Sequence, residues 1–267
     1  MNVVVLLKQT FDTEEKVVLR DAPANGAKSV DAFISDDGVK FIINPYDEYG
    51  VEEAIRIKEN LGGKITLVSV GPERTTEALR TGLAMGADEA VLIRDDRISS
   101  DEYAVSRVIA AQLATMEWDV ILGGNFAVDS GSGQVAIRVA ALLGIPHVSA
   151  VTSLTIEGNR ATAVRDAEGD TETIEVGLPA LFTAQQGLND PRYPSLPGIM
   201  KAKKKPLTIL DIDALGLTDA DISPKTETVT VTPPPVRQAG QLLQGDAAQQ
   251  ASALAELLLP KVARHGA

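Results

Sequence analysis

The chain has 267 residues, of which 44% are hydrophobic and 23% charged, and it carries a formal net charge of −12. This composition is typical of a globular protein with one sizeable core, and it argues against nucleic acid or an anionic membrane as a general partner. The chain has no cysteine and only two histidines, His147 and His265. Disulfides, thiol catalysis and thiolate metal sites are therefore excluded within this chain, and binding or carriage is favoured over catalysis.

The N-terminus predicts a strand and not a targeting segment. "MNVVVLLK" is apolar for only five residues and has neither a basic leader nor a small-residue cleavage site, so it does not have the pattern of a signal peptide. No apolar run approaches the roughly 18–20 residues that are needed to cross a bilayer. We therefore expect a cytoplasmic protein with no membrane insertion.

Strand-like apolar runs alternate with amphipathic helical patterns through the first half of the chain. Strands are expected at residues 3–8, 65–70, 89–94 and 118–124. Helices are expected at residues 51–62, 73–87, 102–116 and 132–144. This alternation predicts βαβ units, right-handed crossovers and a parallel sheet with helices on both faces. The expected fold is a doubly wound, mostly parallel, Rossmann-like α/β domain of the kind that binds adenine nucleotides.

After Pro146 apolar and polar residues alternate, with turn sequences at 157–159 and 168–170. This pattern predicts an antiparallel extension of the sheet. The extension is expected to end in a buried strand at Ala180–Ala184, whose residues are apolar apart from one threonine.

The C-terminal part is expected to form an arm. An acidic stretch that begins at Asp211 is followed by three consecutive prolines and then by an amphipathic helix near residues 247–263. Three prolines in a row form a stiff spacer, so the helix is expected to lie on a partner, or else to dock back on this domain. We divide the chain into an α/β domain, residues 1–210, and an arm, residues 211–267.

Ligands of a doubly wound sheet bind at the carboxyl ends of strands, near a switch in strand order. The first expected strand ends in Leu6-Leu7-Lys8 and the second in Val70, and "NPYD" at residues 44–47 precedes a helix. The strongest signal is "GNFAVDSGSGQV" at residues 124–135, because glycines let the backbone approach a phosphate and free N–H groups at a helix start attract an anion. A nucleotide site is therefore expected at these strand ends.

Within this glycine-rich loop, Ser132, Gly133 and Gln134 are placed to offer backbone N–H groups. Asp129 could accept a hydrogen bond from a ribose hydroxyl or cap the loop. Residues 131–136 also match G-x-G-x-x-A, but they follow the fourth strand and not the first βα turn, so the indication for NAD is weak. No Walker pattern for phosphate cleavage is present. The alternative is that the glycines only form a turn.

The segment 187–206, "GLNDPRYPSLPGIMKAKKKP", joins apolar residues to a cluster of lysines. Pro191, Pro194 and Pro197 argue against a regular helix or a central strand here, and a surface loop is expected. Its apolar side chains, such as Leu196 and Met200, either fold back on their own domain, with the lysines as a solvated face, or meet another molecule.

Several of these motifs occur in the same order in one family. The chain resembles the β-subunit of electron-transfer flavoprotein, in particular its Gram-positive bacterial form, from Met1 to about Asp213. The resemblance rests on "VVVLLKQTFDTEEKVVL", "NPYDEYGVEEAIRIKE", "VSVGP", "LRTGLAMGADEAVLI", "DVILGGNFAVDSGSGQV" and, most specifically, "LNDPRYPSLPGIMKAKKKP".

The resemblance implies an electron carrier and not an enzyme. Its α-subunit would hold the redox FAD, and the heterodimer would take electrons from acyl-CoA dehydrogenases and pass them through a quinone oxidoreductase towards the quinone pool. The β-subunit would bury an AMP or, in electron-bifurcating relatives, a second FAD. The family's nucleotide contacts fall in this chain on Leu6, Asn44, Pro45, Tyr46, Asp47, Val70, Gly124, Asn125, Phe126, Ala127, Val128, Asp129, Ser130, Gly131, Ser132, Gly133, Gln134 and Val135.

The resemblance also assigns a role to the segment 187–206, which in the family is the recognition loop for the partner dehydrogenase. Leu196 matches the leucine that anchors this loop in a hydrophobic pocket of the partner. A buried apolar anchor supplies binding energy, while lysines steer the encounter with an acidic surface. Partner contacts are therefore expected at Leu196, Pro197, Ile199, Met200, Lys201, Lys203, Lys204 and Lys205. The arm 211–267 is expected to pack on the α-subunit.

The sequence departs from the family pattern in several places, including Asp129-Ser130-Gly131, where many relatives have Asp-x-Asp. Many relatives have Gly-Lys-Gln or Gly-Arg-Gln where this chain has Gly124-Asn125-Phe126, and without that cation the loop suits the single phosphate of AMP better than a diphosphate. Residues 22–33 look longer than usual and are expected to form a surface insertion. Two other functions are alternatives. A nucleotide-dependent enzyme would need a phosphate-cleaving motif, and a nucleotide-binding module without a redox role would leave the loop 187–206 unexplained.

Overall fold

The computed structural model describes residues 1–15, 18–19, 33–35, 38–237 and 239–265. The chain divides into two compact units, Met1–Val231 and Thr232–Ala267. The expected insertion at residues 22–33 lies outside the described residues, except for Phe33, which is buried.

The first unit is built on a nine-stranded sheet. Its strands are β1 (Asn2–Leu6), β4 (Lys64–Val70), β5 (Glu89–Ile93), β6 (Val120–Gly124), β7 (His147–Glu157), β8 (Arg160–Ala167), β9 (Asp170–Gly177), β10 (Ala180–Ala184) and β11 (Leu207–Leu210). Their order in space is β11-β5-β4-β1-β6-β10-β7-β8-β9. Two short strands, β2 (Gln9–Phe11) and β3 (Phe41–Ile43), form a separate antiparallel pair.

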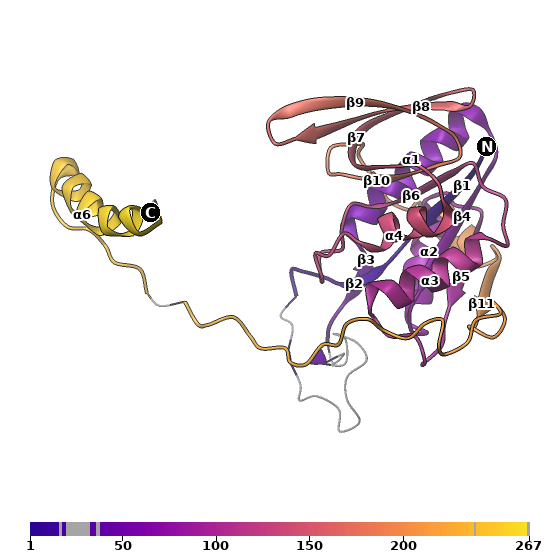
Figure 1. The fold of residues 1–267 in the computed structure, drawn as a ribbon, viewed down its shortest axis with the longest axis horizontal. Helices are drawn as coiled ribbons and strands as arrows, with labels where there is room; N and C mark the ends of the chain where they lie inside the picture. The colour runs from indigo at the N-terminus through magenta and orange to yellow at the C-terminus, as the bar shows by residue number, and fades with distance from the viewer. Residues whose placement is uncertain (16–17, 20–32, 36–37, 238, 266–267) are drawn as a thin grey trace. The chain divides into compact units, whose positions relative to one another are not determined.

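All neighbouring strands from β11 to β7 run parallel, whereas β7–β8 and β8–β9 are antiparallel. Figure 1 shows β8 and β9 as a ribbon at one end of the sheet. The predicted doubly wound, mostly parallel sheet with an antiparallel extension is thus confirmed.

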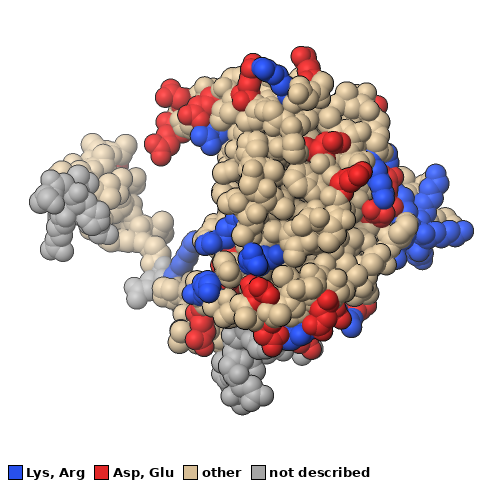
Figure 2. All heavy atoms as spheres, turned by 45° about the vertical axis from the view of Figure 1, so that its right-hand side comes forward, with Lys and Arg blue, Asp and Glu red and all other residues tan. Residues whose placement is uncertain are grey.

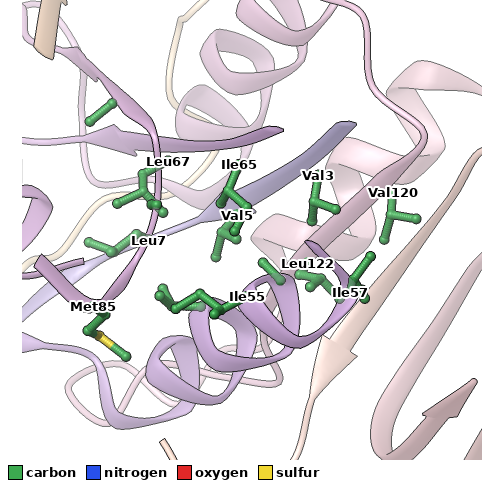
Figure 3. Packing of buried hydrophobic residues seen from close by; sticks show 14 of the residues in the cluster. Val3, Val5, Leu7, Ile55, Ile57, Ile65, Leu67, Met85, Val120 and Leu122 are labelled. Atoms are coloured by element: carbon green, nitrogen blue, oxygen red, sulfur yellow. The ribbon is translucent and has the colours of Figure 1, made fainter. Parts of the chain in front are cut away.

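Helices cover both faces of this sheet: α1 (Pro45–Leu61), α2 (Thr75–Met85), α3 (Glu102–Leu113) and α4 (Val135–Leu143). The side chains of β1 alternate between the two cores. Val3 and Val5 pack in the core that contains Ile55 of α1, as Figure 3 shows, while Val4 and Leu6 belong to the core formed with α3 and α4. Because β1 is buried on both faces, its sequence is a continuous apolar run.

The strand order reverses between β1 and β6. The chain passes from β1 to β4 and β5 on one side, and then returns to β6 on the other side. Connections that leave a parallel sheet to opposite faces open a crevice at the carboxyl ends of the two strands between them. The carboxyl ends of β1 and β6 are therefore where a ligand is expected.

The segment 187–206 contains a short helix, α5 (Leu196–Ala202), so the prediction that its prolines prevent a regular helix was wrong. Pro197 lies in the first helical turn, where its missing N–H is not needed. The Ser195 hydroxyl accepts a 3.1 Å hydrogen bond from the backbone N–H of Gly198 and caps the helix. The edge strand β11 was not predicted either, because four residues are too few for a clear alternation.

The first unit extends beyond the domain boundary drawn from the sequence at residue 210. Ile212 and Ile222 are 0% and 2% exposed and pack in the core formed with α3 and α4. The part of the acidic stretch that surrounds them therefore belongs to the α/β unit and is not a linker.

The second unit contains α6 (Ala247–His265), close to the residues predicted for the C-terminal helix. Its apolar side chains are exposed by 47–66% at Leu254, Leu257, Leu258 and Leu259. Within the described part of the chain, no helix is both long and apolar enough to cross a membrane.

Candidate functional site

A cavity of about 1210 Å³ opens at the carboxyl ends of β1, β4, β5 and β6. It lies at the switch in strand order, and its volume is sufficient for a nucleotide, since ligand pockets are commonly about 300–1,000 Å³. Most of the predicted contacts line it: Leu6, Asn44, Asp47, Val70, Gly124, Asn125, Phe126, Ala127, Asp129, Ser130, Ser132, Gly133, Gln134 and Val135.

Four predicted contacts do not line the cavity. Pro45 is the first residue of α1, and the ring of Tyr46 packs on Phe126 with 4.2 Å between centroids. Val128 faces Asn44 through its backbone N–H. Gly131 has a φ of +65° and turns the loop. These residues therefore lie outside the lining of the cavity, where Tyr46 and Val128 contact residues that line it.

Asn44 connects the start of α1 to the glycine-rich loop. Its side-chain Nδ2 donates to the carbonyl of Phe126 at 3.0 Å, and its Oδ1 accepts from the backbone N–H of Val128 at 3.1 Å. The residue is 1% exposed. Both ends of the amide are thus used within the protein, and Asn44 acts by holding the loop in place.

Asp47 joins three elements at the switch point. Its carboxylate accepts hydrogen bonds from the backbone N–H groups of Lys8, at 2.7 Å, and Gly124, at 2.8 Å. Burial raises the pKa of Asp47 to about 6, although these hydrogen bonds and the Lys8 charge favour the ionised form. At neutral pH Asp47 is therefore mostly ionised, and it fixes the end of β1 against the end of β6.

The glycine-rich loop leads directly into α4. Gly131 and Gly133 have φ values of +65° and +59°, which glycine adopts without strain. Gln134 is the N-cap residue of α4, and its side chain makes no cap hydrogen bond; it accepts from Arg138 instead. The first backbone N–H groups of a helix lack intrahelical partners and attract anions. This end of the cavity therefore suits a phosphate.

Lys8 supplies a cation beside this loop. Its Nζ lies 2.6 Å from Asp129, and the two side chains are 46% and 11% exposed. Asn125, in the same loop, accepts a hydrogen bond through its Oδ1 from the Thr183 hydroxyl at 3.2 Å. Sequence reasoning placed Lys8 at the end of the first strand but did not assign it to the site.

One wall of the cavity was missed by sequence reasoning. It is formed by residues 94–102, which follow β5, and by residues 222–228. Asp101 ties these segments together, since it caps α3 through the N–H of Ala104 and accepts from the backbone N–H and hydroxyl of Thr226 at 2.9 and 2.6 Å. No local pattern indicates a contact between residues 125 positions apart.

An ion-pair cluster strengthens the same wall. The Arg97 guanidinium lies 2.7 Å from Asp95, 2.9 Å from Asp213 and 3.5 Å from Asp219. Its hydrogen bonds lower the pKa of Asp95 to about 2. In the described residues no group of three or more His, Asp or Glu side chains is placed to hold a metal ion.

The segment 187–206 does not line the cavity. Leu196 and Met200 are 80% and 73% exposed, so their side chains do not fold back into the core. Pro197, Ile199, Lys201, Lys203 and Lys204 are exposed too.

Lys205 differs from the other lysines of the segment. Its Nζ donates to the carbonyls of Leu83 and Ala87 at the end of α2, and burial lowers its pKa. It is therefore engaged within the chain and ties the end of α5 to α2.

Figure 2 shows acidic and basic side chains interspersed over one face, with one projecting group of basic side chains at the right edge.

Comparison with known proteins gives a consistent result. Residues 31–215 match the model of the electron transfer flavoprotein domain. The chain is 54% identical over 260 residues to the electron transfer flavoprotein subunit beta of Bacillus subtilis (strain 168), and the aligned region covers 97% of each chain. It is 40% identical over 257 residues to the subunit of the same name from Syntrophomonas wolfei, covering 96% of this chain and 95% of the relative. It is 34% identical over 250 residues to that of Mycobacterium tuberculosis (strain H37Rv), covering 90% and 91%. The chain therefore belongs to the electron transfer flavoprotein family, as a beta subunit.

Proposed function

We propose that this chain acts in the cytoplasm as the β-subunit of a heterodimeric electron carrier and holds an AMP in the cavity at the switch point. The α-subunit would hold the redox FAD. The heterodimer would take electrons from acyl-CoA and related dehydrogenases and deliver them, through a quinone oxidoreductase, to the quinone pool. In this proposal the chain itself is a carrier subunit and not an enzyme.

The observation that carries the AMP assignment is the arrangement of the glycine-rich loop. Backbone N–H groups at the start of α4 provide for one phosphate. Asn125 is neutral and bound to Thr183, and Lys8 is already paired with Asp129. Beside this loop, a second phosphate would have to compete with Asp129 for Lys8, which favours a monophosphate.

The second candidate is an electron-bifurcating subunit with FAD in the same cavity. The observation that favours it is the size of the cavity, about 1210 Å³, with an additional wall at residues 94–102 and 222–228. That space exceeds what a mononucleotide needs, so a dinucleotide is the alternative occupant. A nucleotide-binding module without a redox role is less well supported, because it leaves the exposed Leu196 and Met200 without a purpose.

Two surfaces support assembly and docking. The exposed leucines of α6 fit a helix that packs on the α-subunit. Leu196, Met200 and the lysines beside them fit a docking site for a partner dehydrogenase with an acidic rim, because apolar anchors supply affinity and basic neighbours raise the association rate.

The test is to co-express the chain with its α-subunit, denature the purified complex and quantify the released nucleotides by chromatography. One FAD and one AMP per heterodimer would support the plain carrier. Two FAD and no AMP would overturn it and establish the bifurcating type. If neither an α-subunit nor a nucleotide is retained, both redox proposals fail.

A further inference from the structure

The segment 187–206 is tied to α1 by a clamp formed by Arg192. The guanidinium donates to both carboxylate oxygens of Glu52, at 2.8 and 2.9 Å, and to both oxygens of Glu59, at 2.7 and 3.2 Å. The backbone N–H of Arg192 donates to Glu52 as well, at 3.1 Å. One side chain thus makes two bidentate pairs, which are directional and strong.

Burial makes this clamp a firm constraint. The Glu52 side chain is 4% exposed, whereas that of Glu59 is 55% exposed. Burial alone would raise the pKa of Glu52, but the hydrogen bonds from Arg192 lower it below the ordinary value. Without Arg192, this buried carboxylate would keep only Arg56, 3.3 Å away, as a partner. Loss of most of the pairing of a buried charge is costly, so release of Arg192 from α1 is opposed.

Asn189 makes a second tie to α1. Its Nδ2 donates to the carbonyl of Tyr49 at 3.0 Å and to Glu53 at 2.9 Å. Asn189 is 8% exposed and Glu53 is 7% exposed. The chain before α5 is therefore fixed at two points to one face of α1.

The other end of the segment is fixed to α2. Arg80 donates to the carbonyls of Ala202 and Lys205 at 2.6 and 2.8 Å. Gly198 lies against the carbonyl of Ala84, where a Cβ would come within 2.5 Å. Polar ties thus hold both ends, while Leu196 and Met200 between them face outward.

We propose that Arg192 is a positioning residue for partner docking: by holding residues 187–206 on α1, it presents Leu196 and Met200 in the conformation that an acyl-CoA dehydrogenase binds. This inference rests on the docking role proposed above. It adds that the loop is ordered before the encounter.

The physical reason is the entropy of ordering. Fixing the backbone of a loop and immobilising flexible side chains at an interface both cost conformational entropy. When the clamp already holds the loop in the free protein, its conformational entropy is lost during folding and does not have to be lost again on association. Loss of the clamp should therefore weaken docking without changing electron transfer inside the formed complex.

The experiment uses the purified heterodimer as electron acceptor of an acyl-CoA dehydrogenase that is reduced by its own acyl-CoA. The main variant combines Arg192→Gln with Glu52→Gln, so that no unpaired carboxylate is left buried. Glu59→Gln removes only the exposed half of the clamp and covers the case in which the double variant does not fold. Leu196→Ala tests the docking surface itself, and Arg160→Gln, which removes an exposed arginine 3.8 Å from Glu175, is the matched control.

We expect the double variant to raise the KM for the heterodimer about tenfold and to leave kcat within about twofold. Glu59→Gln should give a smaller rise in KM, and Arg160→Gln none. Amide hydrogen exchange in residues 193–202 should become faster in the double variant, while exchange in the main sheet stays unchanged. If Arg192 only stabilised the fold, the variant would not show a raised KM with an unchanged kcat and faster exchange confined to residues 193–202.

The outcomes separate the two proposals. If Leu196→Ala raises KM but the double variant changes neither KM nor exchange, the role of Arg192 is overturned and the docking surface stands. A raised KM without faster exchange in residues 193–202 also overturns the role of Arg192. If Leu196→Ala leaves KM unchanged, the docking function itself fails and this inference falls with it.

Discussion

The carboxylate of Asp47 accepts a 2.8 Å hydrogen bond from the backbone N–H of Gly124, so the start of α1 is joined to the end of β6 across the switch point. Gly124 is the residue at which the glycine-rich loop begins, and its missing Cβ leaves the space that Asp47 and Tyr46 occupy. The wall of the cavity at the switch point is therefore set by a contact between residues 77 positions apart.

Gly124→Ala should disrupt this contact. The new Cβ would collide with the Asp47 carboxylate and would lie 2.8 Å from the Cβ of Tyr46, so the loop must move. We expect a loss of about 2 kcal/mol in the free energy of unfolding and less nucleotide in the purified heterodimer. Urea unfolding and nucleotide release measure the two effects.

Gly123→Ala is the matched control for this prediction. Its Cβ would meet Leu6 at 3.5 Å and Ala136 at 3.7 Å, which are ordinary contacts. It should therefore retain the nucleotide. Equal nucleotide content in both variants would contradict a role of Gly124 in the cavity wall.

Asp47→Asn should change how stability depends on pH. Because the folded-state pKa is raised to about 6 while the unfolded value is ordinary, the folded protein binds the proton more tightly between these values. The contribution of Asp47 to stability is therefore largest at low pH and falls as pH rises towards 6. Relative to Asp47→Asn, the parent should gain about 2.4 kcal/mol on going from pH 7 to pH 4.

Urea unfolding of both proteins across that pH range measures this difference. A difference that does not vary with pH would contradict the raised pKa of Asp47. A difference of opposite sign would mean that the hydrogen bonds from Lys8 and Gly124 outweigh burial.

Gly198→Ala should weaken partner docking and spare the nucleotide site. A Cβ at this position would push α5 away from the carbonyl of Ala84, and Leu196 and Met200 would be displaced with the helix. We expect the KM for the heterodimer, with an acyl-CoA dehydrogenase as donor, to rise about fivefold to tenfold. Gly177→Ala, whose Cβ would meet open space, should leave KM unchanged, and an unchanged KM in both variants would refute the prediction.

Replacing Leu254, Leu257 and Leu258 together by glutamine should prevent assembly with the α-subunit. These side chains are 47–49% exposed in the chain alone, and glutamine keeps a good helix propensity, so the thermal midpoint of the isolated chain should change little. Size-exclusion chromatography of the variant mixed with the α-subunit measures whether the heterodimer forms. Glu256→Gln in the same helix is the control. Normal assembly of the triple variant would exclude α6 as the α-subunit contact.

The repeated βαβ order can be predicted from the amino-acid sequence, because strands buried on both faces must be continuous apolar runs and the helices between them must be amphipathic. The sequence also located the cavity, since ligands of such a sheet bind where the strand order switches. The glycines at 131 and 133 and the strand-end residues Leu6 and Val70 could be found for this reason. Local pattern also predicted the antiparallel extension.

The residues that support the cavity and the segment 187–206 become apparent in the folded structure and not in the sequence pattern. Three contacts join residues that are more than 100 positions apart: the hydrogen bonds from Thr226 to Asp101, the ion pair of Arg97 with Asp213, and the clamp of Arg192 on Glu52 and Glu59. Helix α5 was not predicted, because a proline disfavours the interior of a helix but is well tolerated in its first turn. Ser195 is the N-cap residue, and it is this position of the cap that places Pro197 in the first turn. The periodicity of the sequence shows which face of a helix or strand is buried. These polar contacts, in contrast, form between residues that become neighbours only when the strands have taken up their order in the sheet.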